Sequence, residues 1–288
     1  MSYERSSNSV MQNIFTAVVQ GIIEGLTEFL PVSSTGHLIL SGKLLSFTGD
    51  KADTFEIIIQ LGAILAVAVI YWRRILSLLG VGRLTPDIAG DQQDQLPGRL
   101  NLLHVILACL PAMVMGLVLH SFITSYLFSA YTVLAGLVFG GIFMLFGESS
   151  KSSSAPSGGL DQITYKQAIA IGVFQCLALW PGFSRSGATI AGGLLAGVGY
   201  RAATNFSFLI AIPMMVAASG FELLKSYNSL TASDTVFFIT GFLVAFVVAL
   251  VAVITFLKLL ERFKLAPFAY YRFALAAVFL VYLLVTDY

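Results

Sequence analysis

The sequence predicts an all-α integral membrane protein with six transmembrane helices and two re-entrant helical hairpins, arranged as an inverted-topology repeat. Three observations lead to this prediction: the composition, the lengths of the apolar segments, and a sequence repeat at a fixed interval. Of the 288 residues, 57% are hydrophobic and 11% are charged, whereas soluble domains carry about 25% charged residues. A chain of this composition is expected to lie largely within a lipid bilayer.

The same composition limits the partners of the chain. The formal net charge is +1, so we expect membrane lipids and no nucleic acid as partners. Cys109 and Cys176 lie inside apolar runs and are expected to be buried without forming a disulfide. We expect no cleavable signal peptide, because the first apolar stretch already carries Glu24 and Glu28.

Six apolar runs are long enough to cross a bilayer, which takes about 20 helical residues. They cover residues 54–72, 101–120, 127–147, 202–224, 235–260 and 267–286. Most of the Lys and Arg residues fall between alternate runs, in 73–100, 148–166 and 258–272. Because cytoplasmic loops carry an excess of positive charge, these three regions are predicted to lie inside and both termini outside.

Two further apolar regions, 13–48 and 165–199, are each interrupted by a short polar break. The breaks at 31–36 and 181–187 both contain Pro, Ser and Gly. Irregular backbone is tolerated at membrane depth only where protein or a polar cavity satisfies its hydrogen-bonding groups. We therefore predict that each region is a re-entrant hairpin whose tip lies inside the membrane.

The two hairpin regions align without a gap when the sequence is shifted by 151 positions. The shift places Ser33 on Ser184 and Gly36 on Gly187, so the matches include polar residues at the breaks. Each half contains one hairpin and three spanning helices, and because three is odd, the second half is inverted relative to the first. Such repeats usually place a ligand site near the membrane midplane, where the halves meet.

The domain organisation follows from this repeat. Residues 1–288 are predicted to form a single membrane domain made of two inverted repeats, 11–147 and 162–288. The segment 149–159 is rich in Ser, Pro and Gly and is predicted to be a flexible linker between them.

Two carboxylates precede the first break. Glu24 and Glu28 are four residues apart, so they share one face of a helix. Like charges in this position repel each other, and burying either in lipid is costly. A divalent cation would resolve both problems, and carboxylate oxygens suit Mg²⁺ or Ca²⁺. We predict that Glu24 and Glu28 bind such an ion; a water-facing pair, or one protonated carboxyl, is the alternative.

Three adjacent hydroxyls follow the first proline, at Ser33, Ser34 and Thr35. Free backbone N–H groups at the start of a helix favour an anion, so this segment is predicted to bind phosphate. Ser34 and His37 are three residues apart and can meet on one helical face. This spacing permits a nucleophile with a base or a proton donor. A capping serine and an unrelated histidine form the alternative interpretation.

The second break centres on Arg185, which the predicted topology singles out as a basic residue at membrane depth. Its planar guanidinium matches phosphate oxygens, and Ser184, Ser186 and Thr189 add hydroxyl donors beside it. The alternative is that Arg185 neutralises a glutamate of the first break as a buried ion pair. Together, the two breaks suit a metal-bound diphosphate better than the path of an ion channel or a pump.

At these residues the chain resembles the undecaprenyl-diphosphate phosphatase family, also called the bacitracin-resistance family. Residues 24–37 resemble the first motif of the family and residues 181–189 its second, and 55–62 and 206–213 are also similar. The resemblance implies a multi-pass bacterial inner-membrane hydrolase that converts undecaprenyl diphosphate to undecaprenyl phosphate and inorganic phosphate. It also implies recycling of the peptidoglycan lipid carrier, resistance to bacitracin and dependence on a divalent cation.

The resemblance further implies an acidic motif at Glu24 and Glu28 and essential roles for His37 and Arg185. We take Glu28, Ser34, His37 and Arg185 as the predicted catalytic residues, and Ser33, Thr35, Ser184, Ser186 and Thr189 as the predicted substrate-binding residues. In the expected mechanism Ser34 attacks the terminal phosphorus while His37 transfers protons. Attack by a water molecule activated by His37 is the variant.

Several readings remain open at this stage. A lipid transporter or flippase is the rival function, because inverted repeats with broken helices are common in transporters; a purely structural scaffold would not explain the buried charges.

His104 and His120 are expected to be packed or interfacial, and Tyr270 and Tyr271 to anchor the chain at the membrane surface. Gln60 is a candidate for orienting a site group. The oligomeric state is open, and a homo-oligomer is compatible with the sequence.

Overall fold

The computed structural model describes residues 2–81, 100–149, 159–226, 234–259 and 264–286. Within these ranges the chain consists of helices joined by short turns and contains no strand. The longer helices are α1 (Ser2–Thr27), α2 (Ser34–Leu44), α3 (Asp50–Ile70), α4 (Trp72–Leu78), α5 (Leu102–Phe122), α6 (Ala130–Glu148), α7 (Tyr165–Gln175), α8 (Arg185–Leu195), α9 (Tyr200–Ser226), α10 (Thr235–Leu259) and α11 (Ala266–Thr286). The all-α class predicted from the sequence is confirmed.

Six of the described helices are long and apolar enough to cross a membrane: α3, α5 with the π turn that follows it, α6, α9, α10 and α11. Each overlaps one of the six predicted runs. Their starts carry local signals for helix formation; for example, Ser129 caps α6 by accepting a hydrogen bond from the Thr132 backbone. The predicted linker at 149–159 lies mainly outside the described residues.

Helix α10 packs against both α1 and α3 through very close backbone contacts. A Cβ atom added at Gly25 of α1 would lie 2.8 Å from both the Ala245 carbonyl oxygen and the Ala249 nitrogen of α10. Gly62 of α3 likewise lies against the carbonyl of Phe242. Small residues allow membrane helices to approach this closely. Because the hydrophobic effect does not drive helices together within lipid, dispersion contacts between the closely packed helices stabilise their association instead.

The second group of helices packs around α8. Helix α8 contacts α6, α7 and α9, while α7 also packs against α5, and α6 against α11. Helix α8 is buried along almost its whole length, from Ser186 to Leu194. It is an 11-residue helix, and therefore only about 16 Å long. Its polar first turn consequently lies inside the protein.

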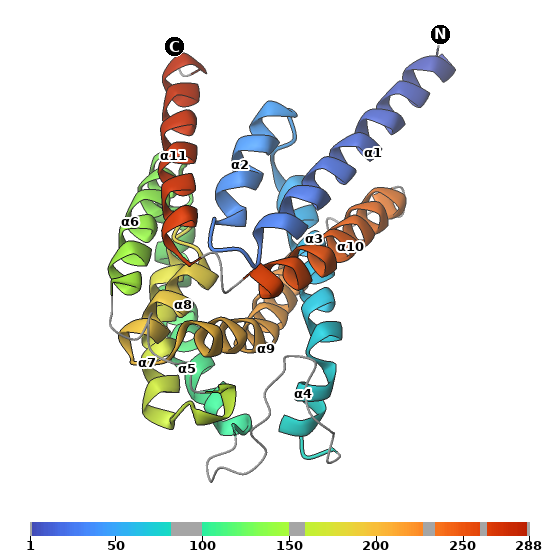
Figure 1. Ribbon diagram of the computed structural model, residues 1–288. Helices are drawn as coiled ribbons and strands as arrows, with labels where there is room; N and C mark the ends of the chain where they lie inside the picture. The colour runs from blue at the N-terminus through green and yellow to red at the C-terminus, as the bar shows by residue number, and fades with distance from the viewer. Residues whose placement is uncertain (1, 82–99, 150–158, 227–233, 260–263, 287–288) are drawn as a thin grey trace.

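Figure 1 shows how the short helices are arranged. Helices α1 and α2 join at a turn near the middle of the molecule, and both rise from it towards the end at which the N and C labels lie. Helix α7 lies towards the opposite end, beside α5, and leads to α8. The two pairs thus bring their turns into the interior of the helical assembly.

We expect Gly25→Ala to destabilise the protein by about 1–3 kcal/mol, because the added methyl group overpacks the contact with α10. The measurement is the unfolding midpoint of purified protein in detergent. Gly220→Ala is the matched control, because no atom lies within 4 Å of a Cβ added at Gly220 of α9. Equal midpoints for the two variants would contradict the close contact.

Candidate active site

The second interior turn, at residues 180–183, is a proline–glycine turn. The Phe183 nitrogen donates to the Trp180 carbonyl oxygen at 3.0 Å. Pro181 occupies the second position, and Gly182 occupies the third with a φ of +89°, which is the arrangement of a type II turn. The first turn also centres on a proline, since the Val32 nitrogen donates to the Leu30 carbonyl oxygen across Pro31 at 2.8 Å.

Both turns end in a serine that starts the next helix in the same way. Ser33 has a φ of +71° and Ser184 a φ of +73°. Each hydroxyl accepts a hydrogen bond from the backbone nitrogen of the glycine three residues later, Gly36 or Gly187. These serines are N-caps, so the breaks predicted at 31–36 and 181–187 end earlier than expected, and their last three residues already belong to α2 and α8.

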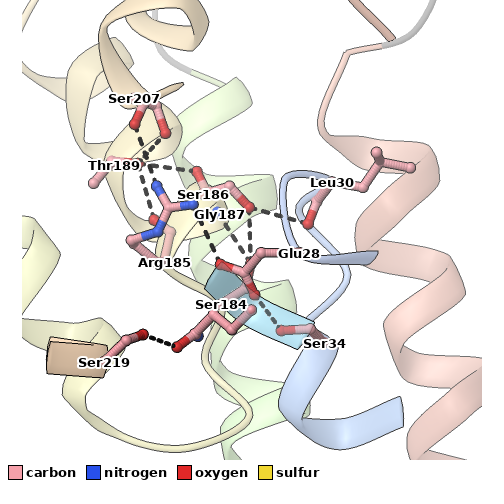
Figure 2. A network of polar contacts seen from close by, with 11 residues as sticks. Glu28, Leu30, Ser34, Ser184, Arg185, Ser186, Gly187, Thr189, Ser207 and Ser219 are labelled. Atoms are coloured by element: carbon pink, nitrogen blue, oxygen red, sulfur yellow. Dashed lines mark hydrogen bonds and ion pairs between the residues drawn. The ribbon is translucent and has the colours of Figure 1, made fainter. Parts of the chain in front are cut away.

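The two turns contact each other directly (Figure 2). The Ser186 hydroxyl donates to the Leu30 carbonyl oxygen at 3.0 Å. Arg185 Nη2 lies 3.5 Å from Glu28 Oε1, within a pair whose side chains are only 13% and 7% exposed. Residues more than 150 positions apart in the sequence therefore form one buried polar cluster.

Glu28 receives partners from both turns. The Ser34 hydroxyl donates to its Oε2 atom at 2.5 Å, while Arg185 approaches Oε1. Ser34 is the first residue of α2 and Arg185 the first residue of α8. A hydroxyl bonded this closely to a carboxylate can pass its proton to that carboxylate, which is the relation required of a nucleophile and its base.

Arg185 is held in place from several sides while keeping donors available. Its Nη1 group donates to the Ser207 carbonyl oxygen at 3.2 Å, and its guanidinium lies over the Phe29 ring. The Thr189 hydroxyl is fully buried; it donates to the Arg185 carbonyl oxygen and lies 2.6 Å from the Ser207 hydroxyl. In the described part of the chain no acceptor faces Arg185 Nε. This guanidinium can therefore still bind an anion.

The hydroxyls predicted to bind phosphate occupy different environments. Ser33 is buried as a cap, whereas Ser34 and Thr35 on the first turn of α2 are partly exposed. The Ser184 and Ser186 hydroxyls lie 3.2 Å apart on the second turn. Thr189 faces Ser207 and the Arg185 backbone, so it supports the turn. The phosphate-binding roles of these residues remain predictions.

Glu24 lies in the last turn of α1, four residues before Glu28, which directly follows the helix, and it is 1% exposed. Within the described chain its Oε1 atom is buried without a hydrogen-bond partner. A buried carboxylate oxygen without a donor is costly unless a cation or a proton satisfies it. Among the residues that the structure describes, no three or more His, Cys, Asp or Glu side chains are grouped so that they could hold a metal ion. Two carboxylates with phosphate and water oxygens nevertheless fit Mg²⁺ or Ca²⁺.

The His37 ring is hydrogen-bonded away from Ser34. Its Nδ1 atom lies 2.7 Å from the Ser33 carbonyl oxygen, and its Nε2 atom lies 2.7 Å from the Tyr271 hydroxyl of α11. A carbonyl oxygen only accepts, so Nδ1 carries the proton, and Nε2 of the neutral ring accepts from Tyr271. The helical spacing allowed Ser34 and His37 to meet, but in this structure each side chain has another partner.

Three residues of this region were not predicted from the sequence as parts of the site: Ser207, Tyr271 and Arg272. Arg272 is 0% exposed and donates to the carbonyl oxygens of the second turn. Its position seven residues into an apolar segment was a usable signal, because ionisable residues inside membrane segments are usually functional. Tyr271 carried no comparable signal, since tyrosine is common at membrane interfaces. The structure adds a hydrogen bond to His37 and leaves the side chain 48% exposed, so its interfacial position stays a prediction.

Comparison with known proteins gives a consistent answer. The family described as "Bacitracin resistance protein BacA" matches residues 17–278. The chain belongs to this family. Curated relatives named "Undecaprenyl-diphosphatase 1" from Bacillus thuringiensis subsp. konkukian (strain 97-27) and from Bacillus anthracis are each 54% identical to it over 274 residues. A third, from Bacillus thuringiensis (strain Al Hakam), is 53% identical.

Each of these matches covers 95% of this chain and the full length of the relative. The match to the family includes both turns and all the residues predicted for the site. With its six helices of spanning length, this member of the BacA family is a multi-pass membrane protein.

We expect Ser184→Ala to destabilise the protein by about 1–2 kcal/mol and Ser184→Gly by only a few tenths, because both lose the cap but glycine tolerates a positive φ. The measurement is the unfolding midpoint in detergent. The comparison of the two variants is internal, since both lack the hydroxyl. A larger loss for glycine than for alanine would contradict the assigned backbone conformation.

Proposed function

We propose that the chain hydrolyses undecaprenyl diphosphate to undecaprenyl phosphate and inorganic phosphate in the bacterial plasma membrane. This reaction recycles the lipid carrier for peptidoglycan synthesis and gives resistance to bacitracin. The observation that carries the proposal is the meeting of Glu28, Ser34 and Arg185 at two buried turns. The full-length similarity to proteins named undecaprenyl-diphosphatase supports the same reaction.

We infer further that the pairs α1–α2 and α7–α8 are re-entrant hairpins of two inverted repeats, 11–147 and 162–288. The shift of 151 positions places the first and last residues of α2 on those of α8. The turns after them also correspond, because Phe47 donates to Gly42 as Val198 donates to Gly193. Helices α2, α7 and α8 have 11 residues each and span about 16 Å, roughly half of the hydrocarbon core. The apolar part of α1, Ile14–Thr27, is also shorter than a membrane span, so each pair would enter and leave on one side.

The terminal phosphate would bind between the first turns of α2 and α8. Backbone N–H groups at both helix starts favour an anion there. Arg185 would provide the planar donor pair, with Ser184 and Ser186 beside it and Thr35 opposite. Thr189 and Ser33 would contribute by holding the two helix starts. The contact of 3.5 Å between Arg185 and Glu28 is long for an arginine–carboxylate hydrogen bond. Arg185 can therefore turn towards phosphate at little cost.

Glu24 and Glu28 are the residues that would hold a Mg²⁺ or Ca²⁺ ion. Such an ion neutralises charge on the diphosphate oxygens. The support for this assignment is the unpartnered Oε1 atom of Glu24 beside a second buried carboxylate.

In the proposed reaction the Ser34 hydroxyl oxygen attacks the terminal phosphorus and its proton moves to Glu28, with which it is already hydrogen-bonded. The bond from phosphorus to the bridging oxygen breaks, and undecaprenyl phosphate leaves. Water then attacks the phosphoserine and gives a proton to His37, the bond from phosphorus to the Ser34 oxygen breaks, and Glu28 returns its proton to that oxygen. Inorganic phosphate leaves and the proton on His37 passes to phosphate or solvent. Arg185 stabilises the charge on the transferring group in both steps.

His37 keeps its proposed role in proton transfer during the second step, with its neutral Nε2 atom as the acceptor site. In the variant mechanism, His37 activates a water molecule that attacks the substrate directly. Ser34 then serves to orient Glu28, and no covalent intermediate forms.

Purified wild-type protein supplied with a polyprenyl diphosphate and Mg²⁺ is expected to release inorganic phosphate, and excess chelator should abolish the release.

Glu28→Gln should remove most activity, because it deletes the charge that pairs with Ser34 and Arg185. Glu222→Gln, at the far end of α9 beside His120, is the matched control and should retain wild-type rates. Lipid movement across vesicles without phosphate release would favour a transporter instead.

Ser34→Ala tests the nucleophile. If Ser34 attacks the phosphorus, the variant loses turnover, and rapid acid quenching of the wild type with labelled substrate traps phosphoserine at position 34. Ser41→Ala, two turns later on α2, is the control for altered hydroxyl content. Full turnover by Ser34→Ala would eliminate the covalent route and leave attack by water.

Arg185→Lys is expected to reduce kcat/KM by about 10- to 100-fold, because an ammonium group cannot replace a planar pair of hydrogen bonds worth about 1.5–3 kcal/mol each to a charged group. The assay is phosphate release across a range of substrate concentrations. Near-normal kcat/KM in this variant would mean that Arg185 has a structural role as the ion-pair partner of Glu28.

A further inference from the structure

Arg272 is the largest fully buried side chain of the described protein. It lies on α11, in a segment that the sequence marks as membrane-spanning. Positive charges of residues 258–272 were expected to set the topology of the chain from its inner surface. A side chain with no exposed surface cannot meet lipid headgroups, so Arg272 must have another role.

The guanidinium group of Arg272 uses all of its five N–H donors. Nε donates to the Leu137 carbonyl oxygen, Nη1 to Phe183 and the Met144 sulfur, and Nη2 to Gly136 and Gly182. Four of the five acceptors are backbone carbonyl oxygens, and two of these belong to the second turn. Arg272 thus ties α6 and the second turn to α11.

Carbonyl dipoles take the place of a counter-ion here. Across the described ranges, none of the ion pairs includes Arg272. A buried charge without a carboxylate is expensive, and apolar residues would join two helices at lower cost. The presence of this buried charge therefore calls for a reason beyond helix packing.

Arg272 holds Gly182 and Phe183, the two residues that directly precede the strained Ser184. Gly182 and Ser184 both have positive φ values, of +89° and +73°, and the two carbonyl oxygens bonded at 2.7 and 2.8 Å are those of Gly182 and Phe183. Backbone in such conformations persists only where the surroundings fix it. Arg272 supplies this restraint through the carbonyl oxygens of Gly182 and Phe183.

Helix α6 provides the space for the guanidinium. A Cβ atom added at Gly140 would overlap Arg272 Nη2 and the Phe183 carbonyl oxygen. A Cβ atom at Gly187, in the first turn of α8, would lie 3.3 Å from Arg272 Nη1. The positive charge therefore lies directly behind the helix start at which phosphate is proposed to bind.

The structure assigns Arg272 as a positioning residue for phosphate recognition, which fixes the turn 182–184 and thereby the donors of Ser184, Arg185 and Ser186. This inference rests on the proposed function of the site. Arg272 would not touch the substrate itself. Its buried charge would also favour an anion at the adjacent helix start, where the N–H groups of α8 carry partial positive charge.

The test uses full-length Arg272→Lys and Arg272→Met, with Arg73→Gln as the control, since Arg73 stacks on Trp72 far along the chain from either turn. Phosphate release gives kcat and KM, and a direct binding assay with inorganic diphosphate and Mg²⁺ gives Kd. Displacing the phosphate donors is expected to raise KM and Kd by about tenfold or more and to lower kcat/KM by about 100-fold. The control should match the wild type.

A role in folding alone would lower the amount of active protein, and hence the apparent kcat, at unchanged KM and Kd. That outcome would overturn the inference. A double-mutant cycle with Ser186→Ala adds a second criterion. If both residues act through the same turn, the loss in kcat/KM of the double variant is smaller than the product of the two single losses, whereas independent losses multiply. Multiplying effects would also count against the assignment.

If both Arg272 variants fail to fold, Gly140→Ala displaces the guanidinium without removing its charge and should show the same rise in KM and Kd. Gly220→Ala controls for the added methyl group. A Gly140→Ala protein with wild-type KM and Kd would overturn the inference. A wild-type protein that binds diphosphate but releases no phosphate would refute the proposed hydrolysis, while the Kd values would still decide the role of Arg272.

Discussion

The Glu28 carboxylate joins the two halves of the chain, and the organisation of the site depends on this contact. One oxygen accepts a hydrogen bond from the Ser34 hydroxyl, and the other faces Arg185. Burying either charge without the other would cost several kcal/mol. The arginine is thereby retained at a position where it also has donors free for an anion. Because the contact between Arg185 and Glu28 is long, this buried ion pair is weaker than a closely bonded one, and Arg185 can exchange Glu28 for an anion more easily.

A polar site in the interior of a membrane protein must also satisfy its irregular backbone. The serine caps, the Trp180 indole that donates to the Thr132 carbonyl oxygen, and the Arg272 guanidinium provide much of this compensation. Glycines on neighbouring helices allow these groups to approach closely, as at Gly140. Packing by small residues and hydrogen bonding of the turns are therefore two aspects of one arrangement.

Sequence reasoning recovered the spanning helices and the local parts of the site, because these depend on short-range patterns. Hydrophobic runs of sufficient length located all six spans. A spacing of four residues placed Glu24 and Glu28 one turn apart at the end of α1, where the Glu28 nitrogen still donates to the Glu24 carbonyl oxygen. The contrast between Arg185 and its apolar surroundings marked it for a polar site. The alternative of an ion pair between Arg185 and a glutamate was also correct.

What the sequence did not reveal depends on contacts between distant helices. The spacing of Ser34 and His37 permitted a hydrogen bond, but Glu28 and Tyr271 compete for these side chains in the folded protein. Tyr271 and Arg272 are adjacent in the sequence, yet one bonds to α2 and the other to the second turn. A helical period predicts which face a residue occupies, whereas the neighbour on that face is a property of the tertiary structure.

Helix α11 is the last described helix, and it carries both Tyr271 and Arg272 to elements formed far earlier in the chain. During synthesis, the turn at 180–184 leaves the ribosome long before the guanidinium that secures it. The backbone carbonyls of this turn then depend on temporary partners, such as water or the insertion machinery. The hydrogen bonds that secure this turn are therefore complete only when α11 has been made, and a prematurely terminated product would insert its early helices with the turn unsecured.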